Sequence, residues 1–499
     1  MKKTIAILLV AVLAVSSVFA GFSGKATVGL GYNWETKDYG FSNGTGFDVD
    51  VDLATKEADK LAEGDIYAGI KATMSVKVAN KSTVETEKGS EFWNNQDASN
   101  MGKGYALGLF LDVAEAYVAG ENWKVSITGT QGATSYAKSF TTHKEQIKDA
   151  FGNNTSDKKD VADDVTGSFA LNKAPGVTVK VAGFTGSVGF NGSNVKDNEF
   201  FNYNAFLETP EFSFDGLTLQ AAVGASRNID PSLTGDDKTK KFHDFALNTS
   251  AKVGYATDAL SVAVAADFDA VKKDKNSDTI TPYFDASAKV VFAPVTVDAY
   301  YGLDGKLAKE LKGDKYDTKA HKLSAQVATD LAAFDLPVKV TVWGKDILNA
   351  MDYGAKAEVT IDAIKLSVNG GYVIDPLYDT PYLTPEGVEV NLGNRSTNTN
   401  TGKYYLGADV EYTNDLFTAK AGVGFNSLVG KGIKDSAQLT LKASVESDAI
   451  IPGATLKLAY GAADDPQNLL KGQYTIKNKE VADFKQNFGK VEATCTIKF

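Results

Sequence analysis

Apolar and polar residues alternate along this chain in one segment after another, and this pattern constrains the fold more than any other feature. In residues 47–53 the odd positions are Phe, Val, Val and Leu, whereas Asp48, Asp50 and Asp52 occupy the even ones. Successive side chains of a β-strand point to opposite faces, so this segment is predicted to be a strand with one apolar and one charged face. Three carboxylates on one face cannot lie in a dry core, and we expect that face to meet water.

The connections between such segments alternate in length. Strands are expected at, among others, 66–78, 105–117, 123–127, 165–173, 176–190, 200–210 and 217–227. Short connections, such as 120–122, 173–176 and 362–363, take turns with long polar ones, such as 79–103, 131–164 and 375–402. Short turns on one side and long loops on the other are typical of transmembrane up-and-down β-barrels, with the short side periplasmic. The pattern predicts an all-β, antiparallel barrel of about 22 strands, within a range of about 18 to 24.

The prolines support a closed sheet. None of the eleven prolines falls in the middle of an expected strand. Proline removes a hydrogen-bond donor and is excluded from central strands, and a closed barrel has only central strands. A soluble two-sheet sandwich would avoid interior proline as well, but it would not need the alternation of short and long connections. No fixed sequence repeat is evident, which weighs against a solenoid.

The first twenty residues predict a secretory signal peptide. Lys2 and Lys3 precede an apolar run over residues 4–15, and small residues suit cleavage after Ala20. The run is too short for a membrane anchor, and no later stretch approaches the ~20 apolar residues of a spanning helix. We therefore expect export, with residues 1–20 as signal and 21–499 as the barrel. A barrel is the other architecture that satisfies its backbone in lipid, and outer-membrane lipid would surround it.

The last ten residues also form an alternating segment. Val491, Ala493, Cys495, Ile497 and Phe499 are apolar, and the residues between them are polar. This resembles the closing strand of bacterial outer-membrane β-barrels, in which the terminal Phe belongs to the signal read by the barrel-assembly machinery. Phe499 and Ile497 are the expected assembly signal, although an ordinary amphipathic strand could end in the same way. Cys495 is the only cysteine, so no disulfide framework is expected.

Charged residues on the polar faces are candidates for lining a pore. They are Asp48, Asp50, Asp52, Lys71, Lys77, Lys124, Lys180, Lys252 and Lys289, with Lys339 and Lys442 as further members. Rings of charge set pore selectivity, and these carry both signs. Without Lys2 and Lys3 the chain has 50 basic and 63 acidic residues, a formal charge of −13. This charge allows a weak preference for cations, but faces of mixed sign suggest a general aqueous channel. The negative charge argues against nucleic acid as a partner. Alternatively, the charges only keep the lumen hydrated.

No catalytic constellation is evident, and we expect neither an enzyme nor a bound cofactor. The histidines, His143, His243 and His321, lie in loops or at strand starts, and no serine can be tied to His243. The segment 274–278 resembles the start of a calcium loop, but Thr279 stands where that loop needs Gly, so no metal site is expected.

Residues 131–164 form the third long-side loop from the N-terminus. In general porins the corresponding loop folds inward and narrows the channel. We hypothesise that this loop constricts the pore and that residues 143–151 form a short helix in it. The alternative is a loop that lies outside the barrel. No amino-terminal segment is large enough for a plug domain.

Two segments carry a resemblance to a family. Residues 64–72 (GDIYAGIKA) and 116–127 (AYVAGENWKVSI) are similar to segments of the spirochaete (treponemal) major outer sheath or major surface proteins. The resemblance implies an abundant surface protein of the outer membrane that forms pores, is often a homo-oligomer such as a trimer, and can also bind host matrix proteins. It carries over no defined site residues.

The predicted function is that of a porin for passive diffusion of small hydrophilic solutes. The alternative from another class is a surface adhesin that binds host matrix proteins through its long loops, with the barrel as anchor. A third alternative is a soluble secreted β protein.

Overall fold

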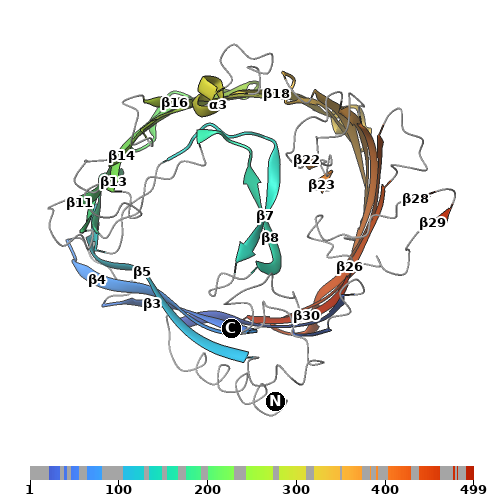
Figure 1. Ribbon diagram of the computed structural model, residues 1–499, viewed down its shortest axis with the longest axis horizontal. Coiled ribbons are helices and arrows are strands. Elements are labelled where there is room, and N and C mark those ends of the chain that lie inside the picture. The colour runs from blue at the N-terminus through green and yellow to red at the C-terminus, as the bar shows by residue number, and fades with distance from the viewer. Residues whose placement is uncertain are drawn as a thin grey trace.

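In the computed structural model, the chain forms one ring of β-strands around a central lumen (Figure 1). The structure describes residues 22–33, 39–41, 46–55, 64–80, 105–127, 134–148, 154–166, 176–192, 201–229, 243–272, 280–310, 320–348, 351–373, 382–383, 389–390, 403–428, 438–460, 476–477, 480–481 and 490–498.

The wall is a single sheet of antiparallel segments in chain order. Its first half consists of β1 (Phe22–Asn33), β2 (Tyr39–Phe41), β3 (Gly46–Ala54), β4 (Tyr67–Asn80), β5 (Tyr105–Gly120), β6 (Trp123–Ser126), β9 (Gly176–Val181), β10 (Phe184–Gly192), β11 (Phe201–Glu208), β12 (Phe212–Phe214), β13 (Leu217–Ile229) and β14 (His243–Ala256). Its second half consists of β15 (Ser261–Lys272), β16 (Thr281–Phe292), β17 (Val295–Asp304), β18 (His321–Asp330), β19 (Val338–Lys345), β20 (Asp352–Ile361), β21 (Ile364–Val373), β24 (Lys403–Thr413), β25 (Thr418–Leu428), β26 (Gln438–Ile451), β27 (Ala454–Tyr460) and β30 (Lys490–Lys498).

The remaining described elements are short and do not belong to the wall sheet. They are the hairpins β7 (Thr142–Lys148) with β8 (Asn154–Ala162), β22 (Tyr382–Leu383) with β23 (Glu389–Val390) and β28 (Ile476–Lys477) with β29 (Glu480–Val481), the helix α3 (Gly305–Glu310) and the 3-10 helix η6 (Leu331–Phe334). Within the described residues, no helix has the length and apolar character needed to cross a membrane.

The first and last strands close the ring. β1 pairs with β30 over nine residue pairs, from Lys25 opposite Lys498 to Asn33 opposite Lys490. The sheet contains 24 segments, but β2 and β3 both pair with β1, and β11 and β12 both pair with β13. Each of these pairs is one interrupted strand, so the wall is a closed antiparallel β-barrel of 22 strands. The predicted fold class and strand number are confirmed.

Two details of the predicted strands are wrong, and they offset each other in the count. The predicted strand 176–190 is two strands, β9 and β10, because the chain reverses at Ala182 and Gly183. Both residues have positive φ, 48° and 84°, as a tight two-residue turn requires. The predicted strand 165–173 does not stand between β6 and β9 in the wall, because these two strands pair directly with each other, and Val165 and Thr166 are not in a strand. The rest of that segment lies outside the described residues, as does most of the predicted turn at 173–176.

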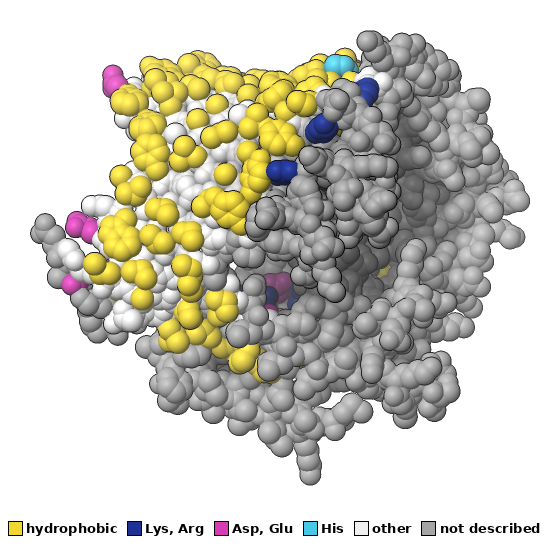
Figure 2. All heavy atoms as spheres, turned by 60° about the vertical axis from the view of Figure 1, so that its left-hand side comes forward, with side chains coloured by type: hydrophobic (Ala, Val, Ile, Leu, Met, Phe, Trp, Pro, Cys, Tyr) yellow, Lys and Arg dark blue, Asp and Glu magenta, His cyan; other side chains and the backbone are white. Residues whose placement is uncertain are grey.

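The register separates an outer from an inner face around the whole barrel. Residues that stand directly opposite each other on paired strands lie on the same face of the sheet. If one residue of such a pair faces the lumen, its partner on the next strand therefore faces the lumen as well. Large apolar side chains remain exposed on the outer face, among them Val368 at 59% and Leu458 at 55%. Figure 2 shows such side chains gathered over the side of the wall around β11, β13 and β14. An exposed apolar belt of this kind is the surface that a bilayer covers.

The most buried side chains lie on the inner face and are mainly polar. Asp267, Asp285, Asn204 and Asp352 are between 0% and 1% exposed. A soluble protein buries apolar side chains and exposes polar ones, whereas here the apolar face is outermost. Asp267 and Asp285 are covered by chain that enters the lumen, whereas Asp352 accepts a hydrogen bond from Tyr405 of the wall at 2.8 Å.

The two faces should respond differently to the same substitution. Leu458→Lys places a charge on the outer face, whereas Ala459→Lys places it on the inner face, directly opposite Glu492 of β30. We expect the first to lower the free energy of unfolding by about 2–4 kcal/mol near the bilayer centre and the second to change it little. Denaturant unfolding of the barrel refolded in lipid vesicles measures both. Equal losses would contradict the assignment of the faces.

Candidate functional site

Two stretches of chain leave the wall and run along the inside of the barrel. Residues 134–141 and 163–166 lie against the inner faces of β14 to β17, and the hairpin β7–β8 extends from them. Seen along the barrel, this hairpin lies across the lumen (Figure 1). We call the two stretches the stem. Residues 134–148 and 154–166 therefore place chain inside the lumen of the barrel.

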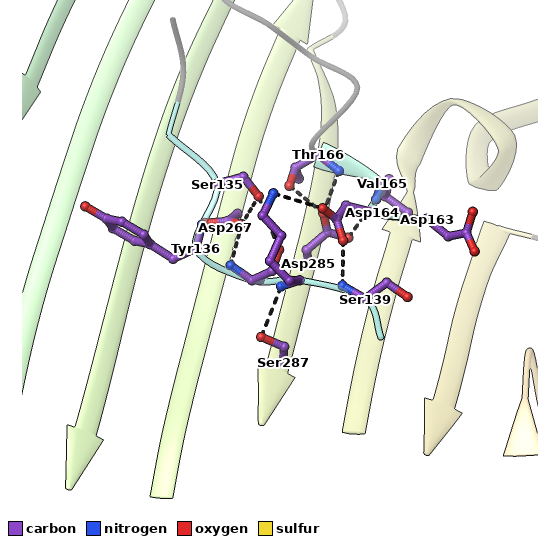
Figure 3. Close-up of polar contacts among 12 residues, drawn as sticks. Ser135, Tyr136, Ser139, Asp163, Asp164, Val165, Thr166, Asp267, Asp285 and Ser287 are labelled. Atoms are coloured by element: carbon purple, nitrogen blue, oxygen red, sulfur yellow. Dashed lines mark hydrogen bonds and ion pairs between the residues drawn. The ribbon is translucent and has the colours of Figure 1, made fainter. Parts of the chain in front are cut away.

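The first leg of the stem, residues 134–141, binds to the carboxylate of Asp267 on β15 (Figure 3). Residues 163–166 form the second leg. The oxygens of the Asp267 carboxylate accept hydrogen bonds from the Ser135 hydroxyl at 2.7 Å, the Tyr136 N–H at 3.0 Å and the Ala137 N–H at 2.8 Å. The hydroxyl of Ser250 on β14 donates to the Thr134 carbonyl, and the Lys138 N–H donates to the Ser287 hydroxyl at 3.2 Å. This leg is therefore fixed to three neighbouring wall strands.

The second leg binds to Asp285 on β16 in the same manner. Its carboxylate accepts from the N–H groups of Val165 at 3.1 Å and Thr166 at 2.6 Å, and from the Thr166 hydroxyl. The Tyr300 hydroxyl of β17 donates to it at 2.6 Å. Val165 also packs with Val271 and Tyr283 of the wall. Glycine is required opposite this leg, because a Cβ at Gly302 would lie 2.7 Å from a methyl carbon of Val165.

Asp267 and Asp285 stand directly opposite each other in the register of β15 and β16, and both are 0% exposed. Neither makes an ion pair with a residue that the structure describes. Two buried carboxylates side by side repel each other and have lost their hydration, which is unfavourable unless donors replace water. The stem supplies those donors, and hydrogen bonds to a charged acceptor are the strong ones. The stem therefore stabilises the two buried carboxylates of the wall, and these carboxylates hold the stem in place.

The two legs also hold each other. The ammonium of Lys138 lies 3.1 Å from the Asp164 carboxylate, which accepts the Ser139 N–H at 2.5 Å. Burial raises the pKa of the Asp164 carboxyl, although Ser139 and Lys138 favour its charged form. The Tyr136 hydroxyl donates to Glu208 of β11 at 2.6 Å, which ties the first leg to a more distant part of the wall.

The structure places the predicted pore-lining residues on wall strands, and six of them form hydrogen bonds or ion pairs there. Asp48 accepts from Ser75 at 2.6 Å, Asp50 accepts from Thr73 at 2.7 Å, and Asp52 lies 3.0 Å from Lys71. Lys124 binds Glu115 at 2.6 Å and Lys252 binds Glu211 at 2.7 Å. Lys180 and Lys289 are exposed and make no ion pair with a described residue. Lys77 stands opposite Gly46 in the register.

Sequence reasoning missed most of a second charged group on the opposite wall. Lys442, which it included, lies 2.7 Å from Asp409, and beside this pair Lys420 lies 3.2 Å from Glu411 and Lys356 lies 3.1 Å from Glu358. These pairs line a recess of about 200 Å³. The signal was available, because all six residues occupy the polar positions of alternating segments. Together, this group and the one around Asp52 and Lys71 place charges of both signs on opposing parts of the inner wall.

Three other predicted features have different outcomes. The expected helix over 143–151 is wrong, because residues 142–148 form β7 and pair with β8. Ile497 lies in β30, opposite Ala26 of β1 and Ala454 of β27. Phe499 and the cleavage position Ala20 lie outside the described residues. Among the residues that the structure describes, no group of three or more His, Cys, Asp or Glu side chains could hold a metal ion.

Comparison with known proteins finds only distant likenesses. No family model and no curated protein matches this chain. Among solved structures, the translocation pore of the P pilus usher PapC is 9% identical, with a TM-score of 0.38, and the match covers 96% of this chain and 99% of that one. OpdK of Pseudomonas aeruginosa with vanillate is 7% identical, with a TM-score of 0.36 and coverage of 96% and 98%. Neither reaches a TM-score of 0.5, so the fold assignment depends on the strand pairing described above.

Removing one charge at Asp267 should loosen the stem. Asp267→Asn keeps the size of the side chain but replaces hydrogen bonds to a carboxylate, each contributing about 1.5–3 kcal/mol, by weaker neutral ones. We expect amide hydrogen exchange in residues 134–141 to accelerate by roughly tenfold or more, measured by mass spectrometry on the barrel folded in micelles.

Asp269→Asn is the matched control for that substitution. Asp269 lies on the same strand, is 2% exposed and accepts from Asn248 at 2.6 Å rather than from the stem. Exchange in residues 134–141 should be unchanged in this variant. The same exchange rate in Asp267→Asn and in the unaltered protein would contradict the anchoring role.

Proposed function

We propose that this protein is an outer-membrane porin that lets small hydrophilic solutes diffuse passively across the membrane. Three features of the described residues support it. The strands form a closed ring, because β1 pairs with β30, and a closed sheet is one of the architectures that satisfy a backbone in lipid. Its outer face is apolar and exposed, as a lipid-facing surface requires. Its inner face carries ion pairs that remain partly exposed, such as those of Lys71, Lys420 and Lys442.

The observation that carries the proposal is the docked stem inside the barrel. A barrel that served only as an anchor would not need a polypeptide hairpin fixed within its lumen by buried carboxylates. In a channel such a segment has a use, because a chain segment across the lumen sets the largest solute that passes. In this mechanism the concentration gradient drives transport. The hydrated polar side chains of the inner wall solvate the solute as it passes, and the β7–β8 hairpin limits the size of the solute.

The proposed location is the outer membrane, with the short turns in the periplasm and the long loops at the surface. The signal peptide over residues 1–20 and the assembly signal at Phe499 remain predictions that belong to this proposal. Membership of the spirochaete surface-protein family, oligomerisation and binding of host matrix proteins remain predictions as well.

Removing the hairpin should widen the channel. Deletion of residues 140–160 takes away β7 and most of β8 but leaves the Asp267 contacts of residues 135–137 in place. We expect a higher single-channel conductance in planar bilayers than for the unaltered protein. A heat-dependent shift in electrophoretic mobility checks that the variant has folded. Unchanged conductance of a folded variant would rule out the hairpin as the constriction.

Neutralising the aspartate row should change ion selectivity. In the variant Asp48→Asn, Asp50→Asn, Asp52→Asn the side chains keep their size, whereas their negative charge on the inner wall is lost. We expect the reversal potential in a salt gradient to move away from cation preference. Lys71→Gln is the control of opposite sign, since it frees Asp52 from its ion pair and should increase cation preference. Reversal potentials that do not move would mean that the current does not pass this row.

A further inference from the structure

A recess of about 420 Å³ lies between the first leg of the stem and the inner wall. Tyr136, Lys138 and Phe140 of the stem line one side of it. The wall side is formed by β13 to β17, and its floor consists of small residues, Gly254, Ala263 and Ala265. Figure 3 shows the edge of this region, where the stem passes over Ser287. The recess has room for a small solute beside the stem.

Most charges around the recess are already matched. Lys138 pairs with Asp164 at 3.1 Å, and Lys252 pairs with Glu211 at 2.7 Å while its ammonium also lies 5.5 Å from the centre of the Tyr136 ring. Opposite charges at these distances cancel in the field that a solute meets. These four side chains therefore do not determine the charge of a ligand.

Two charged side chains of the lining remain, one of each sign. Lys289 on β16 and Asp298 on β17 stand directly opposite each other in the register. They share the inner face, yet they form no ion pair with each other or with another described residue. The only hydrogen bond that the Asp298 carboxylate accepts from a described side chain comes from the neutral amide of Gln326, at 3.0 Å. The recess thus presents an ammonium and a carboxylate side by side.

We propose that this recess binds a small zwitterion, such as a free α-amino acid. The ligand carboxylate lies against Lys289, the ligand ammonium lies against Asp298, and a short apolar side chain rests on Ala263 and Ala265 near Phe140. A simple anion would place its charge beside Asp298, and a simple cation would place its charge beside Lys289. Each would leave one wall charge unmatched, so the arrangement discriminates against both. The proposal deepens the porin function and rests on it for access to the recess.

The test is equilibrium binding of L-valine to the refolded barrel in detergent micelles, followed by saturation-transfer NMR. N-acetylvaline carries only the negative charge and valinamide only the positive one. We expect valine to bind and each single-charge analogue to bind roughly tenfold more weakly, the effect of one charge-assisted hydrogen bond. Lys289→Gln and Asp298→Asn should each weaken valine binding by about the same factor.

Lys180→Gln is the matched control, because Lys180 is also an exposed lysine of the inner wall without an ion pair to a described residue and lies outside the recess. It should leave valine binding unchanged. Equal binding of valine and both analogues, an equal loss in Lys180→Gln, or no valine binding at all would overturn the site. Conductance steps without valine binding would remove this site and keep the porin. Valine binding without conductance would keep the site and remove the porin.

Discussion

The pairing of β1 with β30 is the interaction on which the rest of this structure depends. Lipid offers no partner to a backbone N–H or C=O group, so a sheet in a bilayer must have no edge. The nine residue pairs between the first and last strands remove the edge. Once the ring is closed, the period of two along each strand determines which side chains meet lipid and which face the lumen. The apolar outer belt and the charged inner wall both follow from this closure.

Closure also creates an interior that has to be filled or hydrated, and the protein does both. On one side of the lumen, ion pairs such as Lys71 with Asp52 remain partly exposed on the wall. On another, the stem of the β7–β8 hairpin covers Asp267 and Asp285 completely. Their mutual repulsion is offset by backbone N–H and hydroxyl donors of the stem. The position of the hairpin is thus built into the wall, which suits an element that limits what passes.

The parts of the fold that follow from a period of two could be predicted from the sequence. They include the closed barrel, the side on which the turns are short, and the strand positions of charged residues such as Asp50 and Lys252. The turn at Ala182 and Gly183 was missed because it contains no Asn, Asp or Pro. Its remaining cues are Gly183 itself and a change of phase, since apolar residues occupy odd positions in β9 and even positions in β10.

Features that depend on contacts between distant segments could not be predicted. Residues 143–151 have helix-forming side chains, but pairing with β8 makes a strand of residues 142–148, and such pairing overrides local propensity. In the sequence, Asp267 and Asp285 resemble any other polar position of an alternating strand. Their role as anchors depends on residues more than a hundred positions away, in a stem without regular alternation.

Planar-bilayer conductance of the unaltered protein, refolded without residues 1–20, would show whether the barrel is an open channel. We expect discrete, stable current steps, smaller than those of an unobstructed ring of this strand number because the hairpin occupies part of the lumen. A barrel that is shown to be folded by its heat-dependent mobility and yet gives no steps would contradict it. That result would mean a closed lumen, with the barrel serving as a scaffold for its surface loops.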